Sequence, residues 1–127
     1  MKLFIDDVRF PHDVNLKDED WEIARSYDEA LLYIEEFKPQ RIAFDHDLGA
    51  EHYHGKNPNQ DTGLDVAKWL VKMDMDHPEA GYITEASDFS CHSANPAGKA
   101  NILKLLHAYK CDKFYRNPQQ EKAHVQH

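Results

Sequence analysis

The stretch Lys2-Leu3-Phe4-Ile5-Asp6-Asp7 decides the fold, because an apolar run stops abruptly in two carboxylates. The same pattern recurs in Arg41-Ile42-Ala43-Phe44-Asp45-His46-Asp47-Leu48-Gly49 and in Phe89-Ser90-Cys91-His92-Ser93-Ala94-Asn95-Pro96. A short apolar run that ends in charged or polar residues is typical of a buried parallel strand. In open α/β sheets, ligands bind where such strands end. The sequence therefore predicts one site that gathers Asp6, Asp7, Asp45, Asp47, His46 and His92.

Composition narrows the classes of protein to consider. The chain has 127 residues, of which 41% are hydrophobic, as expected for a single globular domain. A formal net charge of −8 argues against binding of extended duplex nucleic acid, which requires a basic surface, but it permits a nucleotide or RNA-end phosphate in a local pocket. Two cysteines are too few for a disulfide scaffold. No apolar run approaches the ~20 residues of a membrane span, so we expect a cytoplasmic protein without a membrane partner.

Five strands are expected along the chain. They are residues 2–6, Trp21–Arg25, the runs that end at Asp45–Asp47 and at His92–Ser93, and Lys113–Arg116. Helical stretches separate the later strands and are long enough for parallel crossovers. The order predicts an α/β fold with an open, mostly parallel sheet and helices on both faces.

Three helices are expected from their start and stop signals. They begin at a Ser26–Glu29 capping box, at Asp61 or Thr62, and at Pro96; Pro39 ends the first, and the connector Asp74–Glu85 follows the second.

The residues resemble the receiver domain of two-component signalling over nearly the whole chain. The matching segments are Asp6-Asp7, Phe44-Asp45 or Asp47-Leu48, Asp61-Thr62-Gly63-Leu64-Asp65-Val66, Ser93-Ala94, and Lys113-Phe114-Tyr115-Arg116-Asn117-Pro118. The resemblance implies a sheet in the order 2-1-3-4-5. It also shows departures: the Arg9–Asp20 loop replaces the first receiver helix, the last helix is missing, and Asn117 stands where a receiver has its essential lysine.

Three motifs are similar to a receiver offshoot known mainly from phage and bacterial genomes, the cyclic-phosphate processing receiver domain. They are Ile5-Asp6-Asp7-Val8-Arg9, Phe44-Asp45-His46-Asp47-Leu48-Gly49 and His92-Ser93-Ala94-Asn95-Pro96-Ala97-Gly98. The expected domain covers residues 1–118, followed by a polar tail over residues 119–127. For a phage-encoded protein, the cytoplasm would be that of the host.

Carboxylates that crowd into one crevice repel each other and favour a bound cation. A hard divalent ion such as Mg²⁺ or Mn²⁺ takes carboxylate oxygens, waters and phosphate oxygens. We assign Asp6, Asp7 and Asp47 to the metal and Asp45 to catalysis, although either Asp45 or Asp47 can be the equivalent of the receiver's phosphoacceptor.

Two histidines at adjacent strand ends can flank one phosphate. His46 and His92 are therefore candidates to deprotonate a water and to protonate the leaving alkoxide. Alternation along a regular strand would instead turn His46 to the other side of the sheet, under a helix. The phosphate itself is expected to bind a helix N-terminus and nearby polar groups. The residues assigned to it are Ser93, Asn95, Arg9 and Gly98.

Three functions compete on this sequence. The first is metal-assisted hydrolysis of a cyclic phosphate, on an RNA end or in a cyclic nucleotide. The second is a signalling receiver that accepts a phosphoryl group on Asp45 or Asp47, against which the missing lysine counts. The third is a noncatalytic protein that sequesters a nucleotide. We favour the first.

Overall fold

A computed structural model describes residues 1–48 and 62–115 of the chain. Its elements follow in the order β1 (Lys2–Ile5), η1 (Pro11–Val14), η2 (Asp18–Asp20), β2 (Glu22–Ala24), α1 (Tyr27–Phe37), β3 (Arg41–Phe44), α2 (Gly63–Asp76), β4 (Asp88–Cys91) and α3 (Pro96–Phe114). The loop expected over residues 49–61, which contains Glu51, His52, His54 and Asn57, lies outside the described residues, as does the polar tail. No helix in the described part of the chain is long and apolar enough to cross a membrane.

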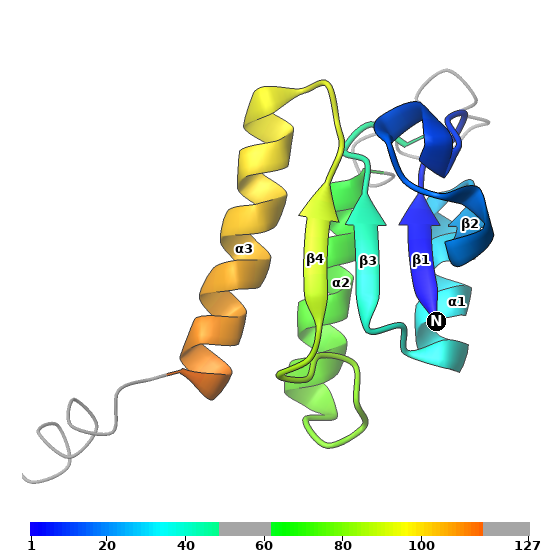
Figure 1. Cartoon of the computed structure of the whole chain (residues 1–127). Coiled ribbons are helices and arrows are strands. Elements are labelled where there is room, and N and C mark those ends of the chain that lie inside the picture. The colour runs from blue at the N-terminus through cyan, green and yellow to red at the C-terminus, as the bar shows by residue number, and fades with distance from the viewer. Residues whose placement is uncertain (49–61, 116–127) are drawn as a thin grey trace, which may run out of the picture.

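The strands form one open parallel sheet in the order β2-β1-β3-β4. Their carboxyl ends therefore point the same way, toward the top of Figure 1. The order 2-1-3-4 confirms the predicted receiver arrangement, with four strands instead of five. Leu3, Phe4 and Ile5 are fully buried, which explains why β1 is a continuous apolar run and not an alternating one.

The fifth strand predicted over Lys113–Arg116 is wrong. Lys113 and Phe114 instead form the last turn of α3. The physical reason is a buried carboxylate on the neighbouring helix: Asp74 accepts hydrogen bonds from the Tyr109 hydroxyl at 2.6 Å and from Lys113 Nζ at 2.7 Å. Residues four apart share one helix face, so both donors reach Asp74 only if the helix continues.

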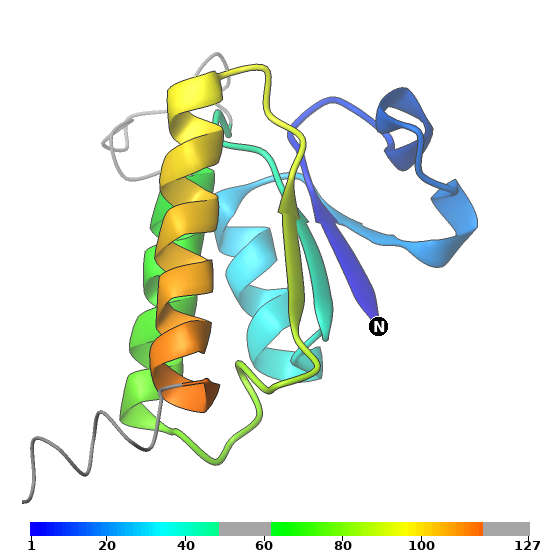
Figure 2. The ribbon, with the colours of Figure 1, turned by 60° about the vertical axis from the view of Figure 1, so that its left-hand side comes forward.

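The three helices cover one face of the sheet, and Figure 2 shows α1, α2 and α3 on the same side of the strands. Helices on both faces were expected, and this part of the prediction is wrong. The main core lies between the helices and the Leu3, Ile5, Ile42 and Phe44 side of the strands. On the other face the η1–η2 segment replaces the first receiver helix, and Trp21 packs there with Phe4 and Ala43.

The helix starts agree with the signals in the sequence. Ser26 Oγ accepts the amide of Glu29, and Thr62 forms a reciprocal capping box with Asp65. Asn95 Oδ1 accepts the amide of Gly98 and so caps α3. These caps fix where each helix begins, and two of them lie beside strand ends that carry the expected site residues.

Candidate functional site

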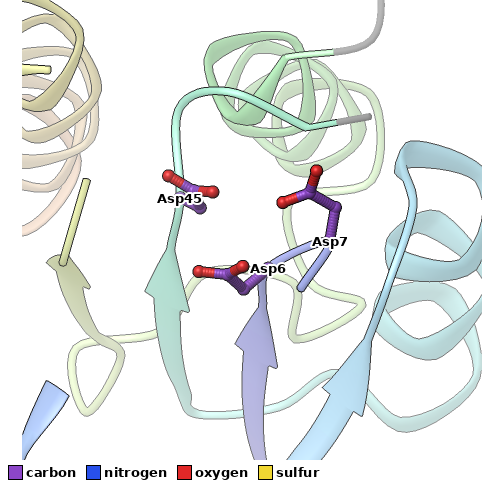
Figure 3. Close-up of side chains that lie close together, drawn as sticks. All are labelled: Asp6, Asp7 and Asp45. Atoms are coloured by element: carbon purple, nitrogen blue, oxygen red, sulfur yellow. The ribbon is translucent and has the colours of Figure 1, made fainter. Parts of the chain in front are cut away.

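Three carboxylates converge at the carboxyl ends of the two central strands. Asp6 and Asp7 follow β1 and Asp45 follows β3, with their side chains turned toward one space (Figure 3). One carboxylate oxygen from each lies within 4.8 Å of the other two. Asp6 is fully buried and Asp45 is 5% exposed. Two buried carboxylates and a third that is half-buried are costly to place together without a cation.

Backbone contacts hold the two strand ends in place. The amide of Asp6 donates to the carbonyl of Ala24 in β2, and the amide of Asp45 donates to the carbonyl of Ile5 in β1, each at 3.0 Å. The start of α2 packs directly on this point, since a Cβ at Gly63 would overlap the carbonyl oxygen of Asp45. Only glycine permits this approach of helix and strand, and it brings Asp45 beside the acidic pair.

Arg9 connects the two most buried carboxylates. Its Nε donates to Asp6 Oδ2 at 2.8 Å, and its Nη2 donates to Asp45 Oδ1 at 3.3 Å. The backbone of this residue is fixed as well: the amide of Arg9 donates to Asp6 Oδ1, and its carbonyl accepts a hydrogen bond from Arg25 Nη1 at 2.5 Å. Arg25 Nη1 also donates to the carbonyl of Asp6. The sequence gives no signal for this role of Arg25, because its side chain acts only on distant backbone carbonyls.

His92 lies against Asp6 on the face opposite the helices. Its amide extends the ladder to the carbonyl of Phe44, and its ring stacks on Phe4 with the centroids 4.4 Å apart. Nε2 is 3.0 Å from Asp6 Oδ2, and an ionised carboxylate only accepts, so this nitrogen carries the proton. Nδ1 is buried and has no hydrogen-bond partner in the described structure. An orphaned buried nitrogen beside three carboxylates is typical of a site that binds something.

The surroundings move the pKa values of Asp6 and Asp45 in opposite directions. Burial raises the pKa of Asp6, but hydrogen bonds from His92 and from the Arg9 and Val8 amides, with the charge of Arg9, outweigh it and hold this pKa well below its ordinary value. Burial raises the pKa of Asp45, the charges of Asp6 and Asp7 raise it further, and Arg9 and His92 only partly oppose them. Two neighbouring carboxyl groups with divergent pKa values are a common arrangement for acid–base chemistry.

His46 and Asp47 lie away from this cluster. His46 Nδ1 is 2.8 Å from Asp47 Oδ1, and the Asp47 side chain is 62% exposed. The His46 ring packs on the first turn of α3, where a Cβ at Gly98 would overlap it. The structure thus brings Asp45, and not Asp47, to Asp6 and Asp7. It also places the two histidines in different surroundings, His92 against Phe4 and His46 under α3.

The expected phosphate ligands lie where β4 leads into α3. Ser93 Oγ accepts the amide of Asn95, and Asn95 Oδ1 accepts the amide of Gly98. These side chains therefore order the helix start in the present structure. Arg9, by contrast, lies within the carboxylate cluster. The lysine position of the receiver, matched by Asn117, lies outside the described residues.

The oxygens of Asp6, Asp7 and Asp45 fit a hard divalent cation. Their spacing lets one ion contact all three, and carboxylate oxygens are the donors that Mg²⁺ and Mn²⁺ prefer.

Comparison with known proteins agrees with this geometry. The family model described as the cyclic-phosphate processing receiver domain matches residues 1–108. No curated protein and no solved structure matches the chain. The matched range includes every strand and most of α3.

Proposed function

The chain belongs to the family of cyclic-phosphate processing receiver domains, and we propose on that premise that it hydrolyses a cyclic phosphate, on an RNA end or a cyclic nucleotide. The observation that carries the proposal is the convergence of Asp6, Asp7 and Asp45 beside Arg9 and His92. Such a crevice combines oxygen ligands for a cation, a guanidinium for a phosphate and groups that can exchange protons.

Hydrolysis of a cyclic phosphate adds water to phosphorus and breaks one ester bond of the ring. One proton must leave the water and one must reach the departing alkoxide. Asp45 is suited to accept the first proton, because its raised pKa makes it more basic than an ordinary carboxylate. Asp6 remains ionised because its pKa is lowered, so it supplies fixed negative charge that holds Arg9 and His92 in place.

In this proposal Asp6, Asp7 and Asp45 hold Mg²⁺ or Mn²⁺. When bound, the ion supplies positive charge that polarises a phosphate oxygen and stabilises charge in the transition state. The planar guanidinium of Arg9 is suited to bind phosphate oxygens in pairs. Ser93, Asn95 and Gly98 are proposed to order the start of α3 beside the phosphate. Asp47 as a metal ligand stays a prediction, and its contact with His46 does not favour it.

The two-histidine hypothesis also stays a prediction. His92 contacts Asp6, whereas His46 pairs with Asp47 and packs under α3. We therefore expect His92→Ala to lower turnover by roughly 10²–10⁴-fold, the range of a lost acid–base group. His46→Ala should have the smaller effect, because its contacts are with α3 and Asp47. An equal loss in both variants would instead favour shared proton transfer by the two rings.

The decisive experiment mixes the purified chain with 2′,3′- and 3′,5′-cyclic nucleotides, with Mg²⁺, with Mn²⁺ and with a chelator. Phosphorus NMR distinguishes the ring from the monoester product. His107→Ala is a matched control, because this histidine is exposed on α3. A metal-dependent product that His92→Ala and Asp45→Asn remove would support the proposal. Absence of any product with either metal, or wild-type rates in both variants, would contradict it.

A second function follows from one specific observation. Asp45, at the end of the central strand β3, joins the acidic pair in the way the receiver resemblance implies for a phosphoacceptor. A small phosphodonor should then leave a covalent phosphoryl group on Asp45, detectable by mass spectrometry, lost in Asp45→Asn and insensitive to His92→Ala. A protein that only sequesters nucleotides would bind the ring tightly and release no product.

A further inference from the structure

The carboxylate of Asp6 has no capacity left for a further partner. Oδ1 accepts hydrogen bonds from the amides of Val8 at 3.0 Å and Arg9 at 2.8 Å. Oδ2 accepts from Arg9 Nε at 2.8 Å and from His92 Nε2 at 3.0 Å. A carboxylate offers about four lone-pair positions, and here four donors use them. A cation that binds Asp6 must therefore displace a donor.

Arg9 is the donor that a cation would displace. Its two amide-like contacts to Asp6 come from different parts of the residue, and only the guanidinium also reaches Asp45. The guanidinium thus bridges the same carboxylates whose oxygens are spaced for a single ion. A divalent ion brings twice the charge of a guanidinium to them. Two cations at the same carboxylates also repel each other, so one must leave.

The surroundings allow the side chain to leave without moving the backbone. Arg25 holds the carbonyl of Arg9 and that of Asp6, and it stacks over the Phe10 ring with its guanidinium carbon 4.6 Å from the centroid. The side chain of Arg9 is 32% exposed, so solvent is adjacent to it. A fixed backbone and a partly exposed side chain make a short rotamer change sufficient.

We propose that Arg9 is an internal counter-ion of the acidic cluster, which a divalent ion displaces, and that the released guanidinium then binds the phosphate of the substrate. The second step rests on the proposed function; the first does not. Arg9 has two positions in this scheme. It bridges Asp6 and Asp45 in the metal-free protein, and it faces the phosphate in the loaded one. The metal and the phosphate ligand are then supplied in a fixed order.

The test measures metal binding and phosphate binding separately. Isothermal calorimetry with Mg²⁺ or Mn²⁺ alone should show that Arg9→Gln binds the ion roughly 10-fold or more tightly than the wild type, the equivalent of one lost charge-assisted contact. Inorganic phosphate added to the metal-saturated proteins should bind Arg9→Gln roughly 10-fold more weakly. One substitution thus strengthens the first ligand and weakens the second, which a general loss of structure cannot produce.

Arg41→Gln is the matched control, because it removes the same charge from a surface pair with Asp88 at the other end of β3. Screening at physiological salt should keep its effect on metal affinity below about twofold. Equal or weaker metal binding in Arg9→Gln than in the wild type would overturn the proposal, as would no binding of either ion to any of the proteins. Unchanged phosphate affinity in Arg9→Gln would overturn the second step.

A measurement on the wild type needs no variant to fold. The Arg9 Nε–H signal in proton–nitrogen NMR spectra should shift when Mg²⁺ is added, because its hydrogen bond to Asp6 is lost, while the Arg41 signal should not move. An unchanged Arg9 signal at saturating Mg²⁺ would contradict the displacement. None of these readouts uses a cyclic phosphate, so a protein that shows the exchange but no turnover would refute only the proposed function.

Discussion

Asp6 and Asp74 are both fully buried carboxylates, yet they lie at opposite ends of the sheet and in opposite electrostatic surroundings. Asp74, on α2, accepts hydrogen bonds from the Ile83 amide, the Tyr109 hydroxyl and Lys113 Nζ. It faces one ammonium group and joins α2 to α3. Asp6 also has its partners, Arg9 and His92, but two further carboxylates lie beside it.

The difference separates a structural carboxylate from a functional one. At Asp74 one negative charge meets one positive charge, and donors from three segments close the site. At the other end several acidic groups share the charge of Arg9, and a second cation is favoured. Burial and hydrogen bonding alone do not distinguish these sites, because both residues have them. The charge balance of the neighbours does.

The largest expected effect is at the balanced site. Asp74→Ala removes the partner of Lys113 and leaves the Ile83 amide without its acceptor, so it should lower the free energy of unfolding by about 3–5 kcal/mol. Urea denaturation measures this loss. The matched control is Asp76→Ala, whose exposed pair with Lys72 should contribute less than about 1 kcal/mol. Equal losses in the two variants would show that Asp74 is not the anchor described here.

The contact between His46 and α3 gives the next effect. Gly98→Ala places a methyl group on the His46 ring, so overpacking should destabilise the fold by about 1–3 kcal/mol despite the better helix propensity of alanine. In a His46→Ala background the overlap disappears, and the same change should then stabilise the fold by up to about 1 kcal/mol. Thermal unfolding of the four proteins tests this reversal of sign. The same loss in both backgrounds would exclude the contact.

The sequence predicted the sheet order and most of the site, because both depend on local patterns. Apolar runs that end in carboxylates placed Asp6, Asp7 and Asp45 at neighbouring strand ends, and the caps Ser26 and Thr62 placed two helices. What failed depended on distant contacts. The segment at Lys113 was taken for a strand, since nothing nearby shows that a buried Asp74 requires a helix there.

The choice between Asp45 and Asp47 failed for a related reason. The two residues alternate along the chain and have the same chemistry, so the sequence alone cannot say which remains beside Asp6 after the strand ends. Gly63 decides it in the structure, because α2 packs on the carbonyl of Asp45. The bridging position of Arg9 is likewise a product of the fold: the two carboxylates that it joins are far apart in the chain.

Removal of charge at the acidic end should have the opposite sign from Asp74. Asp45→Asn removes a carboxylate whose pKa is raised by burial and by the charges of Asp6 and Asp7, so the metal-free protein should gain about 1 kcal/mol at neutral pH. Metal affinity should fall at the same time. Urea denaturation with a chelator and with Mg²⁺ measures both effects. Asp47→Asn, an exposed neighbour, is the control; a loss of stability in chelator for Asp45→Asn would contradict the repulsion.

The smallest effect concerns the pH dependence of the balanced site. Burial raises the pKa of the Tyr109 hydroxyl, and its hydrogen bond to the Asp74 carboxylate raises it further. The neutral phenol is therefore favoured in the folded protein. The stability that it contributes is fully present below the pKa of the unfolded chain, about 10, and is lost as the pH rises toward the folded value. Tyr109→Phe should cost about 1 kcal/mol at pH 7.

The difference in free energy of unfolding between the wild type and Tyr109→Phe should then shrink as the pH rises above about 10. Other groups that titrate there, Lys113 among them, are present in both proteins and largely cancel in this difference. The acidic end predicts no such trend, because Asp6 and Asp45 titrate on the acid side of neutrality. Urea denaturation of both proteins at intervals from pH 7 to pH 11 measures it. A difference that stays constant over this range would mean that the phenol does not donate to a charged Asp74, and the contrast between the two buried carboxylates would lose one of its supports.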